Sequence, residues 1–179
     1  MNFCSQCGGL VKQAIPEGDN LPRHVCQRCG TIHYLNPKLV VGCVAEWNGQ
    51  ILLCRRSITP RYGLWTLPAG FMENGESTSE AAIRETLEEA CARIEIGPLF
   101  SLVNVPHINQ VHLFYRARLL DTGFAPGQET LATALFSEEA LPWQDLAFQS
   151  VTLCLRAYFA DRRSGHFSFH EEKLQPRPG

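Results

Sequence analysis

The apolar positions along the chain fall mainly into short runs that predict β-strands. Residues 39–47 and 50–56 are two such runs, and the Asn48-Gly49 pair between them is typical of a tight β-hairpin with a type I′ turn. Further strands are predicted over residues 64–71, 92–102, 110–119 and 131–136. No strict alternation of strands with helices is visible, so the pattern does not predict a simple parallel sheet.

Two segments carry helical signals instead. Residues 77–91 open with Ser77 followed three positions later by Glu80, the capping-box pattern that satisfies free N–H groups at a helix start. Residues 149–163 place Val151, Leu155 and Phe159 at helical spacing and end before Ser164-Gly165. The chain therefore combines at least six strands with two helices.

The composition changes near Asn36-Pro37, because the chain before it is polar and rich in Gly, Pro and Cys. We therefore expect a small module over residues 1–36, a main domain over residues 37–165 and a C-terminal segment over residues 166–179. The last ten residues, ending QPRPG, predict a loose tail.

Length and charge narrow the possible classes of protein. The chain has 179 residues and a formal net charge of −2, which argues against a protein that binds nucleic acid through an excess of Lys and Arg. No apolar run approaches the roughly 18 residues that a membrane helix needs, and no secretory signal pattern opens the sequence. We expect a cytoplasmic protein without a membrane partner, in which cysteines serve as metal ligands or buried thiols.

Four of the eight cysteines form two CxxCG turns near the start of the chain, and 18 residues separate the two pairs. This spacing predicts a structural Zn²⁺ site at Cys4, Cys7, Cys26 and Cys29, with every ligand position filled by sulfur. Coincidental pairs or redox-active CxxC sites are the alternatives. Because the module has little basic excess, we favour a scaffolding or dimerisation role. Cys43, Cys54, Cys91 and Cys154 are expected to be small apolar core residues.

Residues 70–92 hold six glutamates and a single basic residue, Arg84. On a helix Glu85, Glu88 and Glu89 share one face, and we expect that face to point outward. The opposite stripe, which would pack on a sheet, is Ala82, Ile83, Leu87 and Ala90. The spacing fits a Mg²⁺ site and equally fits a solvated acidic helix face, so spacing alone leaves both open.

These residues resemble the Nudix box, G-x5-E-x7-R-E-U-x-E-E-x-G-U, with U a bulky apolar residue. Six residues are in register: Gly70, Glu76, Arg84, Glu85, Glu88 and Glu89. Thr86, Cys91 and Ala92 depart from the pattern at positions that affect packing and the helix C-cap. The resemblance implies an α+β fold, an α/β/α sandwich with a mixed sheet, preceded by a small zinc ribbon.

The resemblance also implies roles for individual residues. Glu85, Glu88 and Glu89 would bind Mg²⁺ or Mn²⁺, joined by the Gly70 carbonyl. Arg84, four positions from both Glu80 and Glu88, would orient carboxylates, and Glu76 would brace the loop or reach a metal through water. A further acid is expected beyond the box. Glu129 matches it best as a metal ligand, with Glu138 and Glu139, at an expected helix start, as alternatives.

Over residues 4–170 the chain is similar to ribbon-bearing FAD/ADP-ribose pyrophosphatases of plant chloroplasts and bacteria. It lacks the SQPWPFPxS stretch of ribbon-bearing NADH pyrophosphatases. The implied activity is hydrolysis of ADP-ribose or FAD with release of AMP. The resemblance also implies a small nucleotide as the partner, no nucleic acid, and a homodimer. Arg55 and Arg56 could bind phosphates or simply pair at the surface. The alternatives are an NADH or nucleoside-triphosphate pyrophosphatase, and a nucleotide-sensing regulator whose ribbon binds nucleic acid or protein.

Overall fold

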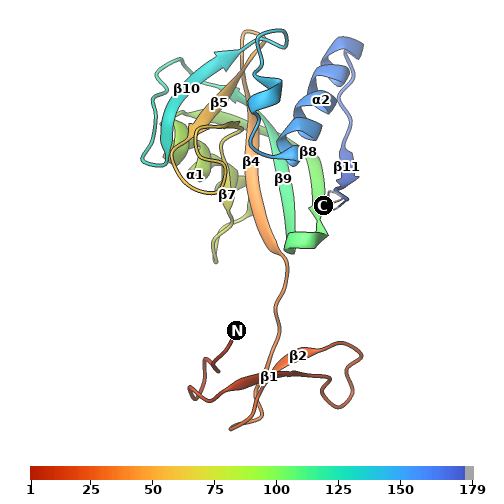
Figure 1. Cartoon of the computed structure of the whole chain (residues 1–179). Coiled ribbons are helices and arrows are strands. Elements are labelled where there is room, and N and C mark those ends of the chain that lie inside the picture. The colour runs from red at the N-terminus through yellow and green to blue at the C-terminus, as the bar shows by residue number, and fades with distance from the viewer. Residues whose placement is uncertain (176–179) are drawn as a thin grey trace. The chain divides into compact units, whose positions relative to one another are not determined.

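The computed structural model describes residues 1–175 and divides the chain into two compact units, Met1–Pro37 and Lys38–Gly179 (Figure 1). The first unit is a three-stranded antiparallel sheet of β1 (Val11–Ala14), β2 (Arg23–Cys26) and β3 (Ile32–His33). Within residues 1–37, all of which the structure describes, only Cys4 and Cys26 are buried. A unit without an apolar core needs another source of stability, and the cysteines are placed to supply it.

The second unit is built on one mixed sheet with the strand order β10-β5-β4-β9-β8-β11. The long strands are β4 (Lys38–Trp47), β5 (Gln50–Arg56), β8 (Ile94–Val105), β9 (Gln110–Leu119) and β10 (Thr130–Phe136). β4 runs parallel to β9, and β8 runs parallel to β11 (His170–Lys173), while the other neighbours are antiparallel. The predicted mixed sheet is confirmed.

The hairpin between β4 and β5 forms as the sequence predicts, because Asn48 and Gly49 adopt positive φ angles of 47° and 82°. The single strand predicted over residues 64–71 is wrong. That segment forms two short strands, β6 (Trp65–Thr66) on β5 and β7 (Ala69–Phe71) on β4. Pro68 lies between them and has no N–H to continue a ladder, while its carbonyl accepts a hydrogen bond from the Cys43 N–H.

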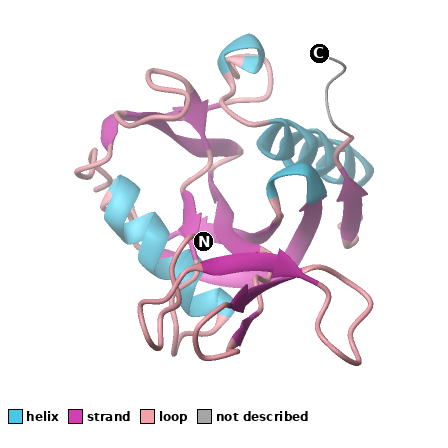
Figure 2. Ribbon diagram, turned by 60° about the horizontal axis from the view of Figure 1, so that its bottom comes forward, coloured by secondary structure: helices cyan, strands magenta, loops and turns pink. Residues whose placement is uncertain are grey.

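Two helices cover opposite faces of the sheet (Figure 2). α1 (Thr78–Ala90) packs on the face that carries Val41, Cys43 and Leu113. α2 (Gln149–Ser164) packs on the other face, against Val44, Leu53 and Phe114. Two short 3₁₀ turns, η1 (Pro106–Ile108) and η2 (Trp143–Asp145), complete the fold. No helix within residues 1–175 is long and apolar enough to cross a membrane.

α1 starts at the predicted capping box but presents a different face from the one expected. Ala81, Ala82, Glu85, Thr86 and Ala90 are its buried residues. The expected core residues Ile83 and Leu87 are 38% and 52% exposed. Small side chains let the helix lie close to the sheet, and the Thr86 hydroxyl is satisfied by the Ala82 carbonyl at 2.7 Å. The helix is therefore rotated so that Glu85 turns inward and not toward solvent.

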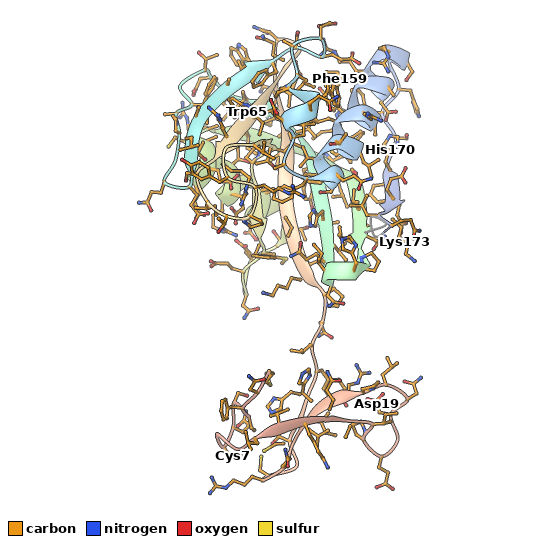
Figure 3. All side chains as sticks on the ribbon, in the orientation of Figure 1. Cys7, Asp19, Trp65, Phe159, His170 and Lys173 are labelled. Atoms are coloured by element: carbon orange, nitrogen blue, oxygen red, sulfur yellow. The ribbon has the colours of Figure 1, made fainter. Side chains whose placement is uncertain are left out.

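The C-terminal segment also differs from the prediction of a loose tail, because residues 170–173 form β11 along the edge of β8. Leu174 is buried against Val103 and Val105, and His170 contacts Asp161 of α2 at 2.8 Å (Figure 3). Residues 176–179 lie outside the described part of the chain. The apolar contact and the polar bond together hold this strand in place.

Three of the four scattered cysteines, Cys43, Cys54 and Cys154, are buried as predicted. The prediction for Cys91 is wrong, since this residue is exposed and caps the C-terminus of α1 with a φ of 48°. A left-handed cap is where helices usually place glycine, so the backbone geometry is kept although the residue differs.

His112 of β9 is a buried polar residue that links the sheet to the start of α2. Its Nδ1 lies 2.8 Å from the Ser150 hydroxyl and its Nε2 2.9 Å from the Gln110 amide oxygen. Burial lowers the pKa of His112 from 6.5 to about 4. The unfolded chain therefore binds a proton that the folded chain rejects between these two pH values.

We expect the free energy of unfolding to fall by up to about 3 kcal/mol as the pH drops from 6.5 to 4 because of His112. His112→Asn should remove this part of the pH dependence. The measurement is urea unfolding followed by tryptophan fluorescence, since all three tryptophans lie in the second unit. The exposed His107 gives a control, His107→Asn, which should keep the wild-type profile. An unchanged slope in His112→Asn would contradict this assignment.

Candidate functional site

The four N-terminal cysteines come together as their spacing predicts. Their sulfurs all lie within 4.8 Å of one another, with Cys4 Sγ 3.7 Å from Cys29 Sγ and Cys7 Sγ 3.5 Å from Cys26 Sγ. A tetrahedral metal with bonds of about 2.3 Å to sulfur separates its ligands by roughly 3.8 Å. The two shorter pairs are close to that separation, so the four sulfurs can close around such an ion with small shifts.

Backbone and side-chain donors surround these sulfurs. The N–H groups of Gln6 and Arg28 each lie 3.4 Å from a cysteine sulfur of their own turn. Gly8 and Gly30 have positive φ angles of 70° and 72°, which close the two CxxCG turns. His33 Nε2 lies 3.2 Å from Cys4 Sγ, a contact that sequence reasoning missed because His33 is outside both turns.

Arg84 organises the acidic face of α1. Its guanidinium binds both oxygens of Glu76, at 3.0 and 2.7 Å, and also contacts Glu85 at 2.7 Å and Glu88 at 3.1 Å. These bonds hold the pKa of Glu76 at about 2. Glu76 also accepts the N–H of Glu73 at 2.7 Å, so it braces the loop before α1. Glu80 does not contact Arg84, because its carboxylate closes the capping box with Ser77.

Glu85 fits into a space that exists only because residue 70 is glycine. A β-carbon placed on Gly70 would lie 2.3 Å from the Glu85 carboxyl carbon. Glu85 is only 8% exposed, and this burial raises the pKa of its carboxyl although Arg84 opposes the shift. Glu85 is thus buried against the backbone at Gly70 and shares the Arg84 guanidinium with other carboxylates. A carboxylate in this position is suited to bind a further cation.

Glu89 lies in the same region and is half-buried, and one of its carboxylate oxygens accepts the N–H of Ala69 at 3.0 Å. Burial raises the pKa of Glu89 to about 7, with the charges of Glu85 and Glu129 adding to the shift and Arg56 opposing it. These charges reach Glu89 because Arg56 ends β5 and Glu129 directly precedes β10, which pairs with β5.

The loop that carries Glu129 is fixed to the end of α1. Gly127 donates its N–H to the Glu89 carbonyl at 3.0 Å, and a β-carbon on Gly127 would lie 1.7 Å from the Glu88 carbonyl oxygen. This close approach needs glycine and brings Glu129 toward the acidic face. Of the alternatives, Glu138 forms an ion pair with Arg163 and belongs, with Glu139, to a turn where a helix was expected.

The two arginines expected to meet phosphates are held in part by backbone carbonyls. Arg55 Nε donates to Gly63 at 2.8 Å, and Arg56 Nε donates to Pro60 at 2.9 Å. The Arg56 guanidinium also lies 5.1 Å from the ring centre of Phe148, at the start of α2. Neither arginine forms an ion pair among the described residues, so the surface-pairing alternative does not describe them.

The carboxylates of the acidic face are not gathered into one set of ligands as the four cysteines are. Within residues 1–175 the cysteine group is the only set of three or more candidate ligands whose ligand atoms all lie within 4.8 Å of one another. Glu85 and Glu88 are turned toward Arg84, while Glu89 is bonded to Ala69. The carboxylate chemistry and the Gly70 space fit a hard divalent cation, which these side chains would reach by rotating.

Comparison with known families identifies the class of protein. The zinc-ribbon profile described as Nudix N-terminal matches residues 2–35, and the profile described as NUDIX domain matches residues 36–154. The chain belongs to the Nudix hydrolase family and is therefore an enzyme of a class that uses divalent metal.

Solved structures support this assignment. The chain is similar to a crystal structure of a NUDIX hydrolase from Nitrosomonas europaea, with 52% identity and a TM-score of 0.95 over 98% of this chain and 100% of that one. It also resembles an ADP-ribose pyrophosphatase from Streptococcus suis, with 26% identity and a TM-score of 0.63 over 76% of this chain and 99% of that one.

Among curated relatives, the NAD-capped RNA hydrolase NudC of Pseudomonas aeruginosa is 28% identical over 91% of this chain and 57% of its own length. The ADP-ribose pyrophosphatase of Methanocaldococcus jannaschii is 36% identical over 41% of this chain and 43% of its own. The chain spans about half the length of the curated relatives it matches. The missing SQPWPFPxS stretch predicts a chain that differs from the NADH pyrophosphatases. The similarity to the NudC relative over most of this chain does not support that difference.

The cysteine geometry predicts one metal ion per chain in the purified protein. Cys26→Ser should lower this value to near zero, because Cys26 is one of two buried residues of the first unit and accepts two backbone N–H bonds. The measurement is elemental analysis of the dialysed protein. Cys91→Ser, at an exposed thiol of the second unit, is the control and should keep one metal. A wild-type value near zero would show that the four sulfurs hold no ion.

Gly70→Ala should displace the Glu85 carboxylate, because the added methyl group cannot coexist with it. We expect Mn²⁺ affinity at the acidic face to fall by roughly tenfold or more, with a melting temperature close to wild type. Electron paramagnetic resonance of free Mn²⁺ provides the readout. Gly123→Ala, in an exposed loop, should bind Mn²⁺ as the wild type does. Equal affinity in Gly70→Ala and wild type would contradict the role given to this space.

Proposed function

We propose that the protein hydrolyses the diphosphate bond of nucleoside diphosphate-X substrates, with ADP-ribose or FAD preferred and AMP as a product. The observation that carries this proposal is the Arg84 cluster: one guanidinium holds Glu76, Glu85 and Glu88 beside the Gly70 space. A protein that only sensed nucleotides would not need three carboxylates gathered against a single cation.

The proposed ligands of the catalytic Mg²⁺ or Mn²⁺ are Glu85, Glu88, Glu89 and the Gly70 carbonyl, joined by Glu129 from the loop before β10. When bound, such ions neutralise the diphosphate and the departing phosphate. The proposed ion at Cys4, Cys7, Cys26 and Cys29 is Zn²⁺, since four thiolates in a tetrahedron suit that metal and leave no open position for chemistry.

The protein's own residues have separable tasks in this proposal. Before a cation binds, Arg84 holds the Glu85 and Glu88 carboxylates on one face of the helix, and both would rotate from Arg84 to reach the cation. In the protein without a cation, the pKa of Glu89 is about 7, so binding of a cation to its carboxylate would displace a proton near neutral pH. Arg55 and Arg56 are proposed to bind the substrate phosphates, since neither has a carboxylate partner among the described residues.

A second candidate substrate class consists of NADH and NAD-type dinucleotides. It is favoured by the relatives described as NAD-capped RNA hydrolases, whose similarity covers up to 91% of this chain. Both classes contain an ADP moiety linked through a diphosphate, so the same acidic face would serve both. NAD-capped RNA belongs in the test for this reason, although the ribbon has little basic excess. The homodimer stays a prediction that light scattering can test.

The proposal predicts that Glu88→Gln and Glu89→Gln each lower kcat by roughly 10³-fold without unfolding the protein. The assay is hydrolysis of ADP-ribose, FAD, NADH, NAD-capped RNA and nucleoside triphosphates with Mg²⁺ or Mn²⁺. Glu171→Gln, in β11 at the far edge of the sheet, is the matched control and should keep wild-type kcat. Wild-type kcat in both box variants would falsify the assignment, and binding of nucleic acid without any hydrolysis would favour the regulator.

A further inference from the structure

A hollow on the surface of the second unit lies away from the Arg84 cluster. It is a cleft of about 320 Å³ between the far ends of β4 and β9, the start of β8 and the middle of α2. Glu46, Arg116 and Tyr158 line it, and we call it the Tyr158 cleft. Val41 of β4 pairs with Gly70, and Glu46, which lines the cleft, is five residues further along the same strand. Roughly 16 Å of β4 therefore separate the cleft from the Gly70 space.

An irregularity in β8 creates this hollow. The pairing of β8 with β9 passes from Ile96↔Ala117 to Leu99↔Tyr115, so two residues of β8 lie opposite Arg116 alone. The extra residues are Gly97 and Pro98. A β-carbon on Gly97 would lie 2.9 Å from the Arg116 carbonyl oxygen, so glycine is needed for this close crossing.

Arg116 supplies a positive charge without a partner in this cleft. Its guanidinium lies 3.4 Å from the ring centre of Phe167, which fixes its orientation, and it forms no ion pair within residues 1–175. Of the other lining charges, Arg118 pairs with Glu95, and the Glu46 carboxylate accepts the Gly49 N–H at 2.6 Å but keeps its negative charge. Because the Phe167 ring covers the flat face of the guanidinium, its N–H groups, which point outward in the plane of the group, can bind a ligand.

Tyr158 supplies a donor beside that charge. The residue is only 3% exposed, and its ring packs on Phe100 and Phe159. Its hydroxyl has no hydrogen-bond partner among the described residues. Within residues 1–175, every side-chain oxygen or nitrogen that is closed off from solvent has a hydrogen-bond partner. The unpaired Tyr158 hydroxyl is therefore accessible to solvent, and it opens onto the cleft that Tyr158 lines. A tyrosine buried this deeply normally finds a partner for its hydroxyl, which makes the free O–H a feature of a binding site.

We propose that the Tyr158 cleft binds the oxyanion of a small ligand, a phosphate monoester or a carboxylate, through the Arg116 guanidinium and the Tyr158 hydroxyl. A guanidinium fork matches two oxygens of such a group, and the phenol donates to one of them. The carboxylates of Glu46 and Glu95 line the same cleft and oppose any anion, so binding depends on the two directed donors.

The test uses the full chain without added Mg²⁺ or Mn²⁺ and titrates inorganic phosphate or acetate at constant ionic strength. Amide signals in ¹H–¹⁵N NMR are the readout. We expect saturable shifts at Gly97 and Arg116, with stronger binding of phosphate if the ligand is a phosphate monoester and of acetate if it is a carboxylate.

Tyr158→Phe keeps the packed ring and should raise the half-saturation concentration at least fivefold, and Arg116→Gln should raise it at least tenfold. The exposed Arg93, which pairs with Asp121, gives the control Arg93→Gln, which should leave binding unchanged. The absence of saturable shifts at Gly97 with both anions overturns the proposal. Equal weakening by Arg93→Gln and Arg116→Gln also overturns it, because that result marks a general effect of charge.

Discussion

The acidic face of this enzyme depends on one guanidinium. Three carboxylates on one helix face repel one another, and like charges at helical spacing cost about 0.2–0.5 kcal/mol for each pair. Arg84 offsets part of that repulsion by binding Glu85 and Glu88, and it ties the face to the preceding segment through Glu76 and the Phe71 carbonyl. The inward rotation of α1, the burial of Glu85 and the space at Gly70 are parts of the same arrangement.

The fold around this face serves to bring distant segments to it. β7 contributes Gly70, β5 contributes Arg56, and the loop before β10 contributes Glu129. Two glycines, Gly70 and Gly127, allow the contacts that no other residue would permit. Residues from four parts of the sequence thus share one small acidic region, although the net charge of the whole chain is only −2.

Much of this could be predicted from sequence, because the decisive signals are local. The Asn48-Gly49 turn, the Ser77 capping box and the two CxxCG turns each act within a few residues, and each forms as expected. The errors involve tertiary packing. The apolar residues Ile83 and Leu87 are exposed because small side chains on the neighbouring stripe allow closer contact with the sheet, and β11 forms because Leu174 and His170 find partners far away in sequence. No local pattern encodes such contacts.

The proposed activity requires that Glu85, Glu88 and Glu89 bind a divalent cation beside Gly70. The most direct measurement is anomalous X-ray scattering from crystals soaked with Mn²⁺. We expect a manganese peak about 2.0–2.3 Å from carboxylate oxygens of these residues, with Glu85 and Glu88 turned away from Arg84. A bound manganese found only elsewhere, with the bonds of Arg84 to Glu85 and Glu88 intact, would contradict it.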